Sequence, residues 1–367
     1  MKKNNLEITF KVLLTGLLIV LLSACGGGGG GGSNGASESG QSGIEQNAGM
    51  KVYVSGINGV ASIDHDTRKV TRIWDGVGDY LGIAVSPDGG FVYFSEYWSG
   101  YVLRYNTTNK AIDGYQARPG ANGIDITLDG QYILLASTSI NPVLTIIDAI
   151  KEEAVEVPLI PSQGGEFGAP RDVVVTPDKT AIYLSTGSYS LYPQQQGMVV
   201  GYITAVYIMP NDEFMIEPLK VGGDPSGGLA MSPDGNYLYA SSLGDVIKVN
   251  LKDPSEVTLI DTVNNRFGSG IAVSPDGRWV YASSGVTGYI NIIDTQTDEV
   301  VNSVYIKNVV IAGTAIFGTA GIAFTPDGKY AYVCSAYDVY VINTETQTVV
   351  GEAINVGFRA FAVAIGR

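Results

Sequence analysis

Three carboxylates in this sequence could transfer protons, namely Asp79, Asp125 and Glu166. A carboxylate acts as a general acid or base when it lies within hydrogen-bond reach of a substrate and its pKa is tuned toward the working pH. Asp125 is the most unusual of the three, because it stands in an apolar stretch where similar stretches carry Ala or Val. A lone carboxylate in such a place is more often a hydrogen-bonded structural group, so we assign no catalytic residue from the sequence.

Histidine and cysteine are too scarce for most other chemistry. The one histidine, His65, stands in the polar stretch Asp64-His-Asp-Thr67, where we expect an exposed turn residue that is not a ligand. A single histidine also excludes most histidine-rich metal sites. The sequence has no nucleophile elbow, no paired-cysteine haem motif and no phosphate-binding loop. We therefore predict no metal ion and no cofactor.

Six further aspartates recur in one short pattern of the type Ser-Pro-Asp-Gly, and they are Asp88, Asp129, Asp178, Asp234, Asp276 and Asp327. They are separated by 41, 49, 56, 42 and 51 residues. In such a pattern proline presets φ, the aspartate hydrogen-bonds to the turn backbone and glycine takes a positive φ. We interpret these aspartates as turn formers rather than as metal ligands or catalytic acids.

Each turn stands between two short apolar stretches, as in Gly270-Ile-Ala-Val-Ser-Pro-Asp-Gly277 and the Trp279-Val-Tyr-Ala-Ser283 that follows. The second stretch carries a Tyr-x-Ser pattern, whose aligned first residues are Tyr53, Tyr93, Leu135, Tyr183, Tyr239, Tyr281 and Tyr332. Cys334 takes the serine position in the last repeat, so we expect its thiol to fill a small-residue site. A third stretch ends before a polar turn, at Asp64, Asn106, Asp148, Asn250, Asp294 and Asn343. Each repeat thus predicts four strands.

The repeats predict an all-β fold, a seven-bladed β-propeller of four-stranded blades over residues 50–367, because repetition at such a period is typical of propellers. The domain begins with Lys51-Val-Tyr-Val-Ser55, which matches a second strand, and ends with Phe361-Ala-Val-Ala-Ile365, which matches a first strand. We expect these two segments to pair in one shared blade. Such pairing closes the ring and removes open sheet edges.

The pattern Ser-Pro-Asp-Gly, Val-Tyr-Ala-Ser and Ile-Ile-Asp-Thr resembles the YVTN-repeat propellers, which are related to the lactonase-type seven-bladed propellers. The resemblance covers roughly residues 50–367 and implies the fold more strongly than the function, since propellers host many unrelated activities. The lactonase-like relatives use a histidine with acidic and arginine residues around the channel. This sequence has no histidine in a first strand, so none of those catalytic positions carries over.

The amino-terminal segment resembles a bacterial lipoprotein signal. Lys2, Lys3 and Lys11 precede an apolar run from Val12 to Leu22, which ends in Leu22-Ser-Ala-Cys25. The run is too short to span a bilayer and has the layout of a secretory signal. The resemblance implies that residues 1–24 are removed and that Cys25 carries lipid on its sulfur and amino group, palmitate included.

Residues 25–49 begin with Cys25 and continue through seven glycines into a Gly/Ser-rich stretch, which predicts a flexible tether. Gly26 follows the cysteine in place of an aspartate, which by analogy with sorting rules favours the outer membrane. We therefore expect a lipid-anchored protein of the cell envelope, in the periplasm or exposed at the surface.

The extra length of the chain falls on connections that a four-stranded blade places on one face: 161–170, 188–197 and 307–318. Long loops on a rigid scaffold are where binding usually occurs. Aromatic and arginine residues are enriched at binding hot spots. The candidate binding residues on this face are Tyr97, Trp98, Phe167, Arg171, Tyr189, Tyr192, Arg266, Phe267, Phe317 and Arg359. The alternative is that several of them only seal the channel mouth or pack the loops.

The charge of the chain excludes one class of partner. The formal net charge is −14, and removing residues 1–24 makes it more negative, so nucleic acid is not expected. Two functions remain open. The first is a non-catalytic scaffold that binds an envelope protein, peptide or glycan as a monomeric domain. The second is a lactonase-like hydrolase of a small lactone or sugar ester, with proton transfer by Asp79, Asp125 or Glu166.

Overall fold

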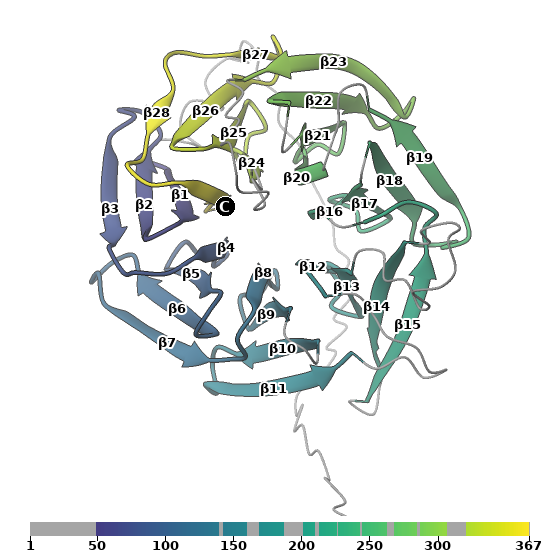
Figure 1. Ribbon diagram of the computed structural model, residues 1–367, viewed down its shortest axis with the longest axis horizontal. Coiled ribbons are helices and arrows are strands. Elements are labelled where there is room, and N and C mark those ends of the chain that lie inside the picture. The colour runs from purple at the N-terminus through teal and green to yellow at the C-terminus, as the bar shows by residue number, and fades with distance from the viewer. Residues whose placement is uncertain are drawn as a thin grey trace, which may run out of the picture.

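The computed structural model describes residues 49–138, 142–159, 169–186, 201–209, 213–225, 227–242, 244–262, 268–284, 287–306 and 321–366. These residues form strands and turns with no helix, arranged as seven sheets around a central axis (Figure 1). The predicted seven-bladed β-propeller is confirmed. The blades are numbered here in chain order, beginning with the blade that contains β1.

Each blade has four positions from the axis outward, and neighbouring strands are antiparallel. The inner strands are β4 (Tyr80–Val85), β8 (Ala121–Ile126), β12 (Asp172–Val175), β16 (Leu229–Met231), β20 (Gly268–Val273), β24 (Ile322–Phe324) and β29 (Ala360–Ile365). The second strands are β1 (Lys51–Gly56), β5 (Phe91–Glu96), β9 (Tyr132–Ser137), β13 (Ala181–Ser185), β17 (Tyr237–Ser241), β21 (Trp279–Ser284) and β25 (Tyr330–Ser335).

The third strands are β2 (Gly59–Asp64), β6 (Tyr101–Asn106), β10 (Val143–Asp148), β14 (Tyr202–Ile208), β18 (Asp245–Asn250), β22 (Tyr289–Asp294) and β26 (Asp338–Asn343). The outer strands are β3 (Val70–Trp74), β7 (Ile112–Gln116), β11 (Glu153–Pro158), β15 (Phe214–Lys220), β19 (Val257–Asp261), β23 (Glu299–Tyr305), and β27 (Thr348–Val349) with β28 (Ile354–Asn355). In blade 7 the last two share the outer position, since both pair with β26.

The ring closes through the two ends of the described chain. The last strand, β29, lies innermost in blade 1 and pairs with β1, with Val52 opposite Ile365 and Val54 opposite Val363. The sheet order β29-β1-β2-β3 is the shared blade expected from the sequence. Blade 1 therefore has four strands like the other blades, with an inner strand supplied by the far end of the chain.

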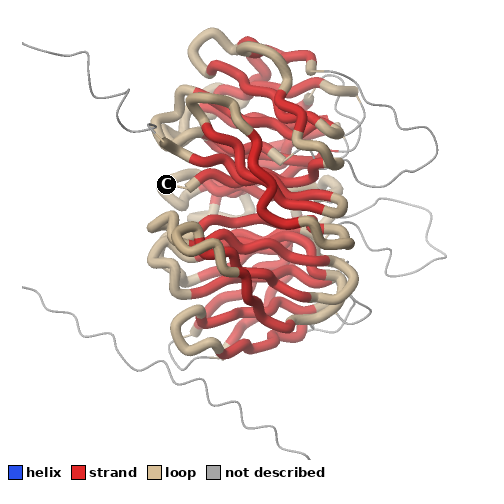
Figure 2. Tube along the Cα trace, turned by 90° about the vertical axis from the view of Figure 1, so that its left-hand side faces the viewer, coloured by secondary structure: helices blue, strands red, loops and turns tan. Residues whose placement is uncertain are grey.

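The two faces of the disc carry different connections. The turn face holds the turns from first to second and from third to fourth strands, and the loop face holds the second-to-third loops and the links between blades. In Figure 2 the carboxyl end after β29 marks the turn face, at the left of the disc. The carbonyl of Met50 accepts a hydrogen bond from the backbone N–H of His65 in a third-to-fourth turn. Both ends of the described chain therefore lie on the turn face.

The recurring aspartates form first-to-second turns, as expected. In blade 6, Ser274 Oγ donates to Asp276 Oδ1 at 2.5 Å, and the N–H of Arg278 donates to the same oxygen at 3.1 Å. Gly277 completes the turn with φ 73°. Equivalent Ser or Thr to Asp bonds occur at Asp88, Asp129, Asp234 and Asp327. These carboxylates are used by their own turns.

The third-to-fourth turns have a common form of their own. The Asp or Asn that ends the third strand accepts backbone N–H groups of the turn, as Asp64 does from Thr67 at 2.8 Å. The fourth residue after it has a positive φ, between 53° and 65°, at Arg68, Lys110, Glu152, Asp298 and Gln347. The side chain at this position points toward the preceding blade in several cases, as described below.

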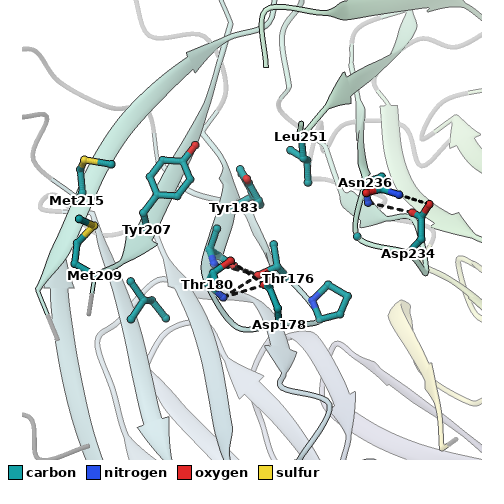
Figure 3. Close-up of a pocket in the computed structure, with 14 residues that line it drawn as sticks. Thr176, Asp178, Thr180, Tyr183, Tyr207, Met209, Met215, Asp234, Asn236 and Leu251 are labelled. Atoms are coloured by element: carbon teal, nitrogen blue, oxygen red, sulfur yellow. Dashed lines mark hydrogen bonds between the residues drawn. The ribbon is translucent and has the colours of Figure 1, made fainter. Parts of the chain in front are cut away.

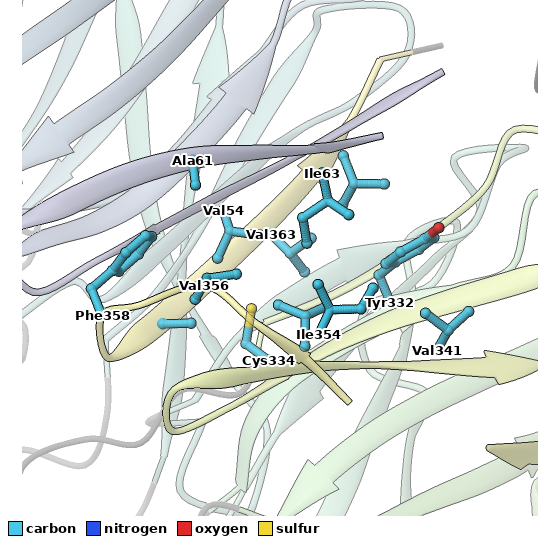
Figure 4. Close-up of a cluster of buried hydrophobic side chains, with 13 residues drawn as sticks. Val54, Ala61, Ile63, Tyr332, Cys334, Val341, Ile354, Val356, Phe358 and Val363 are labelled. Carbon is cyan, nitrogen blue, oxygen red and sulfur yellow. The ribbon is translucent and has the colours of Figure 1, made fainter. Parts of the chain in front are cut away.

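Apolar side chains fill the spaces between neighbouring blades. At the closure between blades 7 and 1, Cys334 is fully buried beside Val54, Val363 and Phe358 (Figure 4). Burial raises the pKa of the Cys334 thiol well above its ordinary value. The expectation that this cysteine fills a small-residue site is confirmed, and its burial argues against a reactive thiolate.

One detail of the repeat alignment was wrong. In blade 3 the residue equivalent to the recurring tyrosine is Leu134, not Leu135, because Leu134 pairs with Asp125 as Tyr93 pairs with Ala84. Leu135 packs toward blade 2 instead. The apolar pair at 134–135 hid the one-residue shift, which places a side chain on the opposite side of a strand.

His65 is half-buried rather than exposed. Its Nδ1 lies 2.7 Å from the Tyr332 hydroxyl of blade 7, and its ring packs on Tyr330 and Tyr332. Burial and then the positive charge of Arg68 lower the pKa of His65. The turn histidine is therefore part of the closure between blades 7 and 1. Within the described ranges, no helix is long and apolar enough to cross a membrane.

Candidate binding site

Four of the ten candidate binding residues lie in the described part of the chain: Tyr97, Trp98, Arg171 and Arg359. The other six lie outside it, and they are Phe167, Tyr189, Tyr192, Arg266, Phe267 and Phe317. Glu166 lies outside it as well. The strands that flank the three long insertions end on the loop face, as the connectivity of a four-stranded blade requires.

Tyr97 and Trp98 form an aromatic corner on the loop between β5 and β6. Their rings meet edge to face with centroids 5.0 Å apart. The indole N–H of Trp98 donates to Asp79 Oδ2 at 2.8 Å, and 68% of Trp98 is exposed. An exposed indole held by a hydrogen bond offers a large apolar surface at low entropic cost on binding.

A buried carboxylate holds this corner in place. Glu96, at the end of β5, accepts hydrogen bonds from the backbone N–H groups of Asp79, Trp98 and Ser99, at 3.3, 3.2 and 2.5 Å. Burial acts to raise the pKa of Glu96, but the hydrogen bonds from Ser99, Trp98 and Asp79 outweigh it and lower the pKa. Glu96 therefore stays ionised and fixes the loop, so that Trp98 is presented from a rigid support.

Arg171 lies beside this corner, at the start of blade 4. Its backbone is fixed on both sides, because its N–H donates to the Ser185 carbonyl and its carbonyl accepts from the N–H of Gly123, both at 2.9 Å. Burial lowers the pKa of the Arg171 guanidinium, and the nearby Asp224 and Tyr97 oppose that shift. Arg171 thus joins Tyr97 of blade 2 to Asp224 of blade 5 in one electrostatic neighbourhood.

Arg359 belongs to a different part of the rim. It lies in the link before β29, its guanidinium is 5.5 Å from the centroid of the Phe361 ring, and its carbonyl accepts from the N–H of Ile57 at 2.9 Å. The structure therefore brings Tyr97, Trp98 and Arg171 together, while Arg359 lies in blade 1.

The sequence interpretation missed Asp172, the first residue of β12. In five other blades the equivalent position is glycine: Gly82, Gly123, Gly228, Gly270 and Gly321. The glycines allow close approach of neighbouring inner strands, since a Cβ on Gly82 would lie 2.3 Å from the Asn122 carbonyl oxygen. An aspartate in a glycine column was the signal that could have found this residue.

Asp172 joins the inner strands of adjacent blades. Its Oδ1 accepts from the N–H of Val173 at 3.0 Å, and its Oδ2 accepts from the N–H of Leu229 in blade 5 at 2.8 Å. Burial raises the pKa of Asp172 to about 7, against the lowering effect of these hydrogen bonds and with a further upward contribution from Asp125. Its carboxyl group can therefore gain or lose a proton near neutral pH.

Asp125 makes the same kind of bridge one blade earlier. Its Oδ1 accepts from the N–H of Ile126 at 2.8 Å, and its Oδ2 accepts from the N–H of Val175 in blade 4 at 3.0 Å. Both oxygens thus accept backbone N–H groups, one of them across the boundary of blades 3 and 4, which favours the structural role left open for this residue. Asp79 is likewise engaged by Trp98. No group of three or more metal-binding side chains occurs within the described ranges.

The comparisons with known proteins show the fold and no family. No protein-family model and no curated protein matches the chain. Among solved structures, a protein of unknown function from Desulfotomaculum acetoxidans is 16% identical with a TM-score of 0.69, and the match covers 87% of this chain and 99% of the other. AztD from Citrobacter koseri, in its apo form, is 14% identical with a TM-score of 0.60, covering 86% and 97%.

A third similar structure is the dihydro-heme d1 dehydrogenase NirN, solved in complex with DHE. It is 20% identical with a TM-score of 0.58, and the match covers 83% of this chain and 63% of NirN. Identities this low establish a shared propeller architecture. Since one architecture supports many functions, they do not assign an activity to this chain.

Proposed function

We propose that this chain is a lipid-anchored cell-envelope β-propeller that binds a partner through its loop face without catalysis. The observation that carries the proposal is the exposed Trp98, held by Asp79 and packed edge to face on Tyr97, beside the half-buried Arg171. Tryptophan, tyrosine and arginine are the residues most enriched among binding hot spots. This composition favours a protein or peptide partner, and a glycan is the alternative that the test below distinguishes.

The position of the chain ends supports this arrangement. Both Met50 and the carboxyl end of β29 lie on the turn face. A tether that runs from a lipidated Cys25 to residue 49 would therefore attach the turn face toward the membrane. The loop face would then point away from the bilayer, where a partner can reach it.

Lipidation at Cys25 has a direct test. In cells labelled with a palmitate analogue, we expect the full-length chain to carry the label and to fractionate with the outer membrane. Cys25→Ser should lose both properties. Cys334→Ser is the matched control, because five second strands carry serine at that position. Label retained in Cys25→Ser would contradict the anchor, and label with inner-membrane fractionation would contradict only the predicted membrane.

Binding is tested by capture from envelope extract with the full-length chain in a mild detergent. A captured partner should be lost with Trp98→Ala and weakened with Arg171→Ala. Tyr337→Ala is the control, because Tyr337 is an exposed aromatic in the second-to-third turn of blade 7. Protease or glycosidase treatment of the extract distinguishes a protein from a glycan. Equal capture by all three variants would contradict the assigned site.

The hydrolase alternative remains a prediction from the sequence, and Asp172 adds a candidate acid or base to Asp79, Asp125 and Glu166, because burial raises its pKa to about 7. A screen of lactones and sugar esters tests it. Turnover that disappears in Asp172→Asn, with Trp98→Ala unaffected, would establish catalysis. Turnover in neither protein, together with partner capture that depends on Trp98, supports the binding scaffold.

A further inference from the structure

A cavity of about 540 Å³ lies between blades 4 and 5. Its lining residues come from turns on the turn face and from the strands beside them, and the turn face is the opposite side of the disc from the loop face. Figure 3 shows Tyr207, Met209 and Met215 along one side and Asp234, Asn236 and Leu251 along the other, with Tyr183 between them. The volume is within the range of small-molecule sites. We call this cavity the blade 4/5 pocket.

At two other blade boundaries the chain fills the corresponding place with its own cation. In blade 2, Arg104 lies opposite Tyr93, with its guanidinium carbon 5.3 Å from the centroids of Phe91 and Tyr115. It also forms an ion pair with Glu152 in the third-to-fourth turn of blade 3. The cation thus rests on aromatic rings of its own blade and reaches an acid of the next.

Blade 5 repeats this arrangement with a lysine. Lys248 lies opposite Tyr239, and its Nζ is 4.6 Å from the centroid of the Tyr237 ring. Nζ donates to Asp298, in the third-to-fourth turn of blade 6, at 2.7 Å. The aromatic rings and the acid together form a site for a positive charge, which the chain itself occupies.

Blade 4 has alanine both at the position of the aromatic ring and at the position of the cation. Ala181 stands where blades 2 and 5 have Phe91 and Tyr237, and Ala205 lies opposite Tyr183 as Arg104 lies opposite Tyr93. Two small side chains therefore replace an aromatic ring and a long cation. Ala181 lines the pocket, and Ala205 is fully buried beside Tyr183, so no long side chain of strands β13 and β14 enters the pocket from these two positions.

The groups that would hold a cation remain around the pocket. Glu217 lies opposite Ala205 on the outer strand, as Asp113 lies opposite Arg104, and Asp113 and Arg104 form an ion pair at 2.7 Å. Glu217 is exposed and does not line the pocket itself, but its charge acts on Tyr207, which does. Asp178 and Asp234 line the pocket, and hydrogen bonds within their turns lower the pKa of both, so both are ionised at neutral pH. Tyr183 and Tyr207 supply aromatic rings.

We propose that the blade 4/5 pocket binds an organic cation on an aliphatic stem, of the alkylguanidinium or alkylammonium class. The charged head would lie among Tyr183, Tyr207 and the carboxylates, in the place that Arg104 takes at the boundary of blades 2 and 3. The stem would contact Met209, Met215 and Leu251. The acidic charge of the whole chain, −14, adds a favourable field for such a ligand.

The first experiment titrates the full-length chain in nonionic detergent with n-butylguanidinium and with its neutral isostere n-butylurea. We expect calorimetric binding of the cation and none of the urea. Glu217→Gln should weaken the affinity for n-butylguanidinium by about 3- to 5-fold, because an exposed ion pair contributes little binding free energy. Equal binding of both probes, or binding of neither, would overturn the proposal.

Two variants compare the pocket with its filled counterpart. Ala205→Arg supplies the chain's own cation and should abolish binding while raising the melting temperature. Arg104→Ala empties the equivalent place in blade 2, so n-butylguanidinium should bind there and restore part of the lost melting temperature. Ala205→Met, a neutral filler, should block binding without the same gain in stability. If Ala205→Arg does not fold, the other two variants still test the proposal. The proposal would be overturned if Arg104→Ala bound no additional n-butylguanidinium and Glu217→Gln bound it with unchanged affinity.

The cation could be a free small molecule or an arginine or lysine side chain of a partner. Titration with the capped tripeptide Gly-Arg-Gly separates these sources. Tighter binding of the tripeptide than of n-butylguanidinium indicates a side chain, and weaker binding indicates a free cation. Each outcome retains the ligand class. Binding in the blade 4/5 pocket is independent of the loop face, so Trp98→Ala should leave it unchanged.

Discussion

The turn face and the loop face differ in how far one blade repeats the next. On the turn face the same bonds recur, so that Asp88, Asp234 and Asp276 each cap their turn in the same way. On the loop face the sequences of the blades differ, and within the described residues the Tyr97–Trp98 corner held by Glu96 occurs in blade 2 alone. The difference teaches that repetition marks side chains used for stability, while departures from it mark places where binding can be added.

The largest expected effect is at the recurring tyrosines, which are shared by most blades. Tyr281→Ala should lower the free energy of unfolding by about 3–5 kcal/mol, because it removes a fully buried ring. Urea denaturation monitored by circular dichroism measures the change. A loss below about 1 kcal/mol would contradict the role of this column in the core.

A hydroxyl comparison sharpens this prediction. The Tyr281 hydroxyl is buried and has no hydrogen-bond partner within the described ranges, so Tyr281→Phe should be no less stable than the wild type. The Tyr332 hydroxyl contacts His65 Nδ1 at 2.7 Å and accepts from Arg68 at 3.1 Å. Tyr332→Phe should therefore cost about 1–2 kcal/mol.

The next effect concerns Asp172, where one blade departs from the glycine column. Its pKa is raised from 3.8 in the unfolded chain to about 7 in the fold. Between these two pH values the folded chain binds more protons at Asp172 than the unfolded chain does. The contribution of Asp172 to the free energy of unfolding is therefore fully present below about pH 4 and is lost as the pH rises through 7. Asp172→Asn should remove this decline with pH. It should also lower stability by about 1–3 kcal/mol at pH 4, because the amide nitrogen cannot accept the second backbone N–H.

Melting temperatures of the wild type and Asp172→Asn between pH 4 and 8 measure this effect. Asp125→Asn is the matched comparison, because Asp125 makes the equivalent bridge from blade 3 to blade 4. Parallel pH curves for the wild type and Asp172→Asn would show that this carboxyl group does not titrate as described.

A smaller effect is expected in the repeated turns. Gly277→Ala should cost about 1 kcal/mol, because φ there is 73°. Lys179 has φ 61° at the equivalent turn of blade 4, so Lys179→Gly should relieve a similar strain, less the small contribution of the exposed Lys179–Asp129 ion pair that it removes. Thermal denaturation of the two variants decides. A loss of more than about 1 kcal/mol in Lys179→Gly would exceed the contribution of the exposed ion pair and would contradict a shared turn geometry.

The smallest effect on stability is expected at the loop face. Trp98→Ala should change the free energy of unfolding by less than about 0.5 kcal/mol, because the side chain is largely exposed. Binding of the captured partner should nevertheless be lost. A large loss of stability in this variant would instead place Trp98 among the residues that support the fold.

The sequence predicted what depends on local pattern. The Ser-Pro-Asp-Gly turns, the closure of the ring by residues 361–365 and the burial of Cys334 followed from turn chemistry and from aligned columns. Contacts between blades were not predictable in the same way. His65 meets Tyr332 across 267 positions, and Asp172 reaches Leu229 across 57. A repeat alignment describes each blade separately and carries no record of which side chains meet its neighbour.

The blade 4/5 pocket shows this limit from the other side. Ala181 and Ala205 are unremarkable when blade 4 is considered alone. Their meaning comes from Arg104 and Lys248, which fill the equivalent place in other blades. The candidate residues that lie outside the described ranges remain predictions, and the loop-face site rests on Tyr97, Trp98 and Arg171.

The closure of the ring also determines how the protein would bear mechanical load. The proposed tether would lead into β1, which is hydrogen-bonded along its length to β29 on one side and to β2 on the other. A pull on the tether toward the turn face acts along the axis of β1, so the two ladders are loaded in shear and their bonds resist together. Had the chain entered through an outer strand, a sideways force could have peeled one bond at a time. The blade that closes the ring would therefore also serve as the mechanical clamp of an anchored protein.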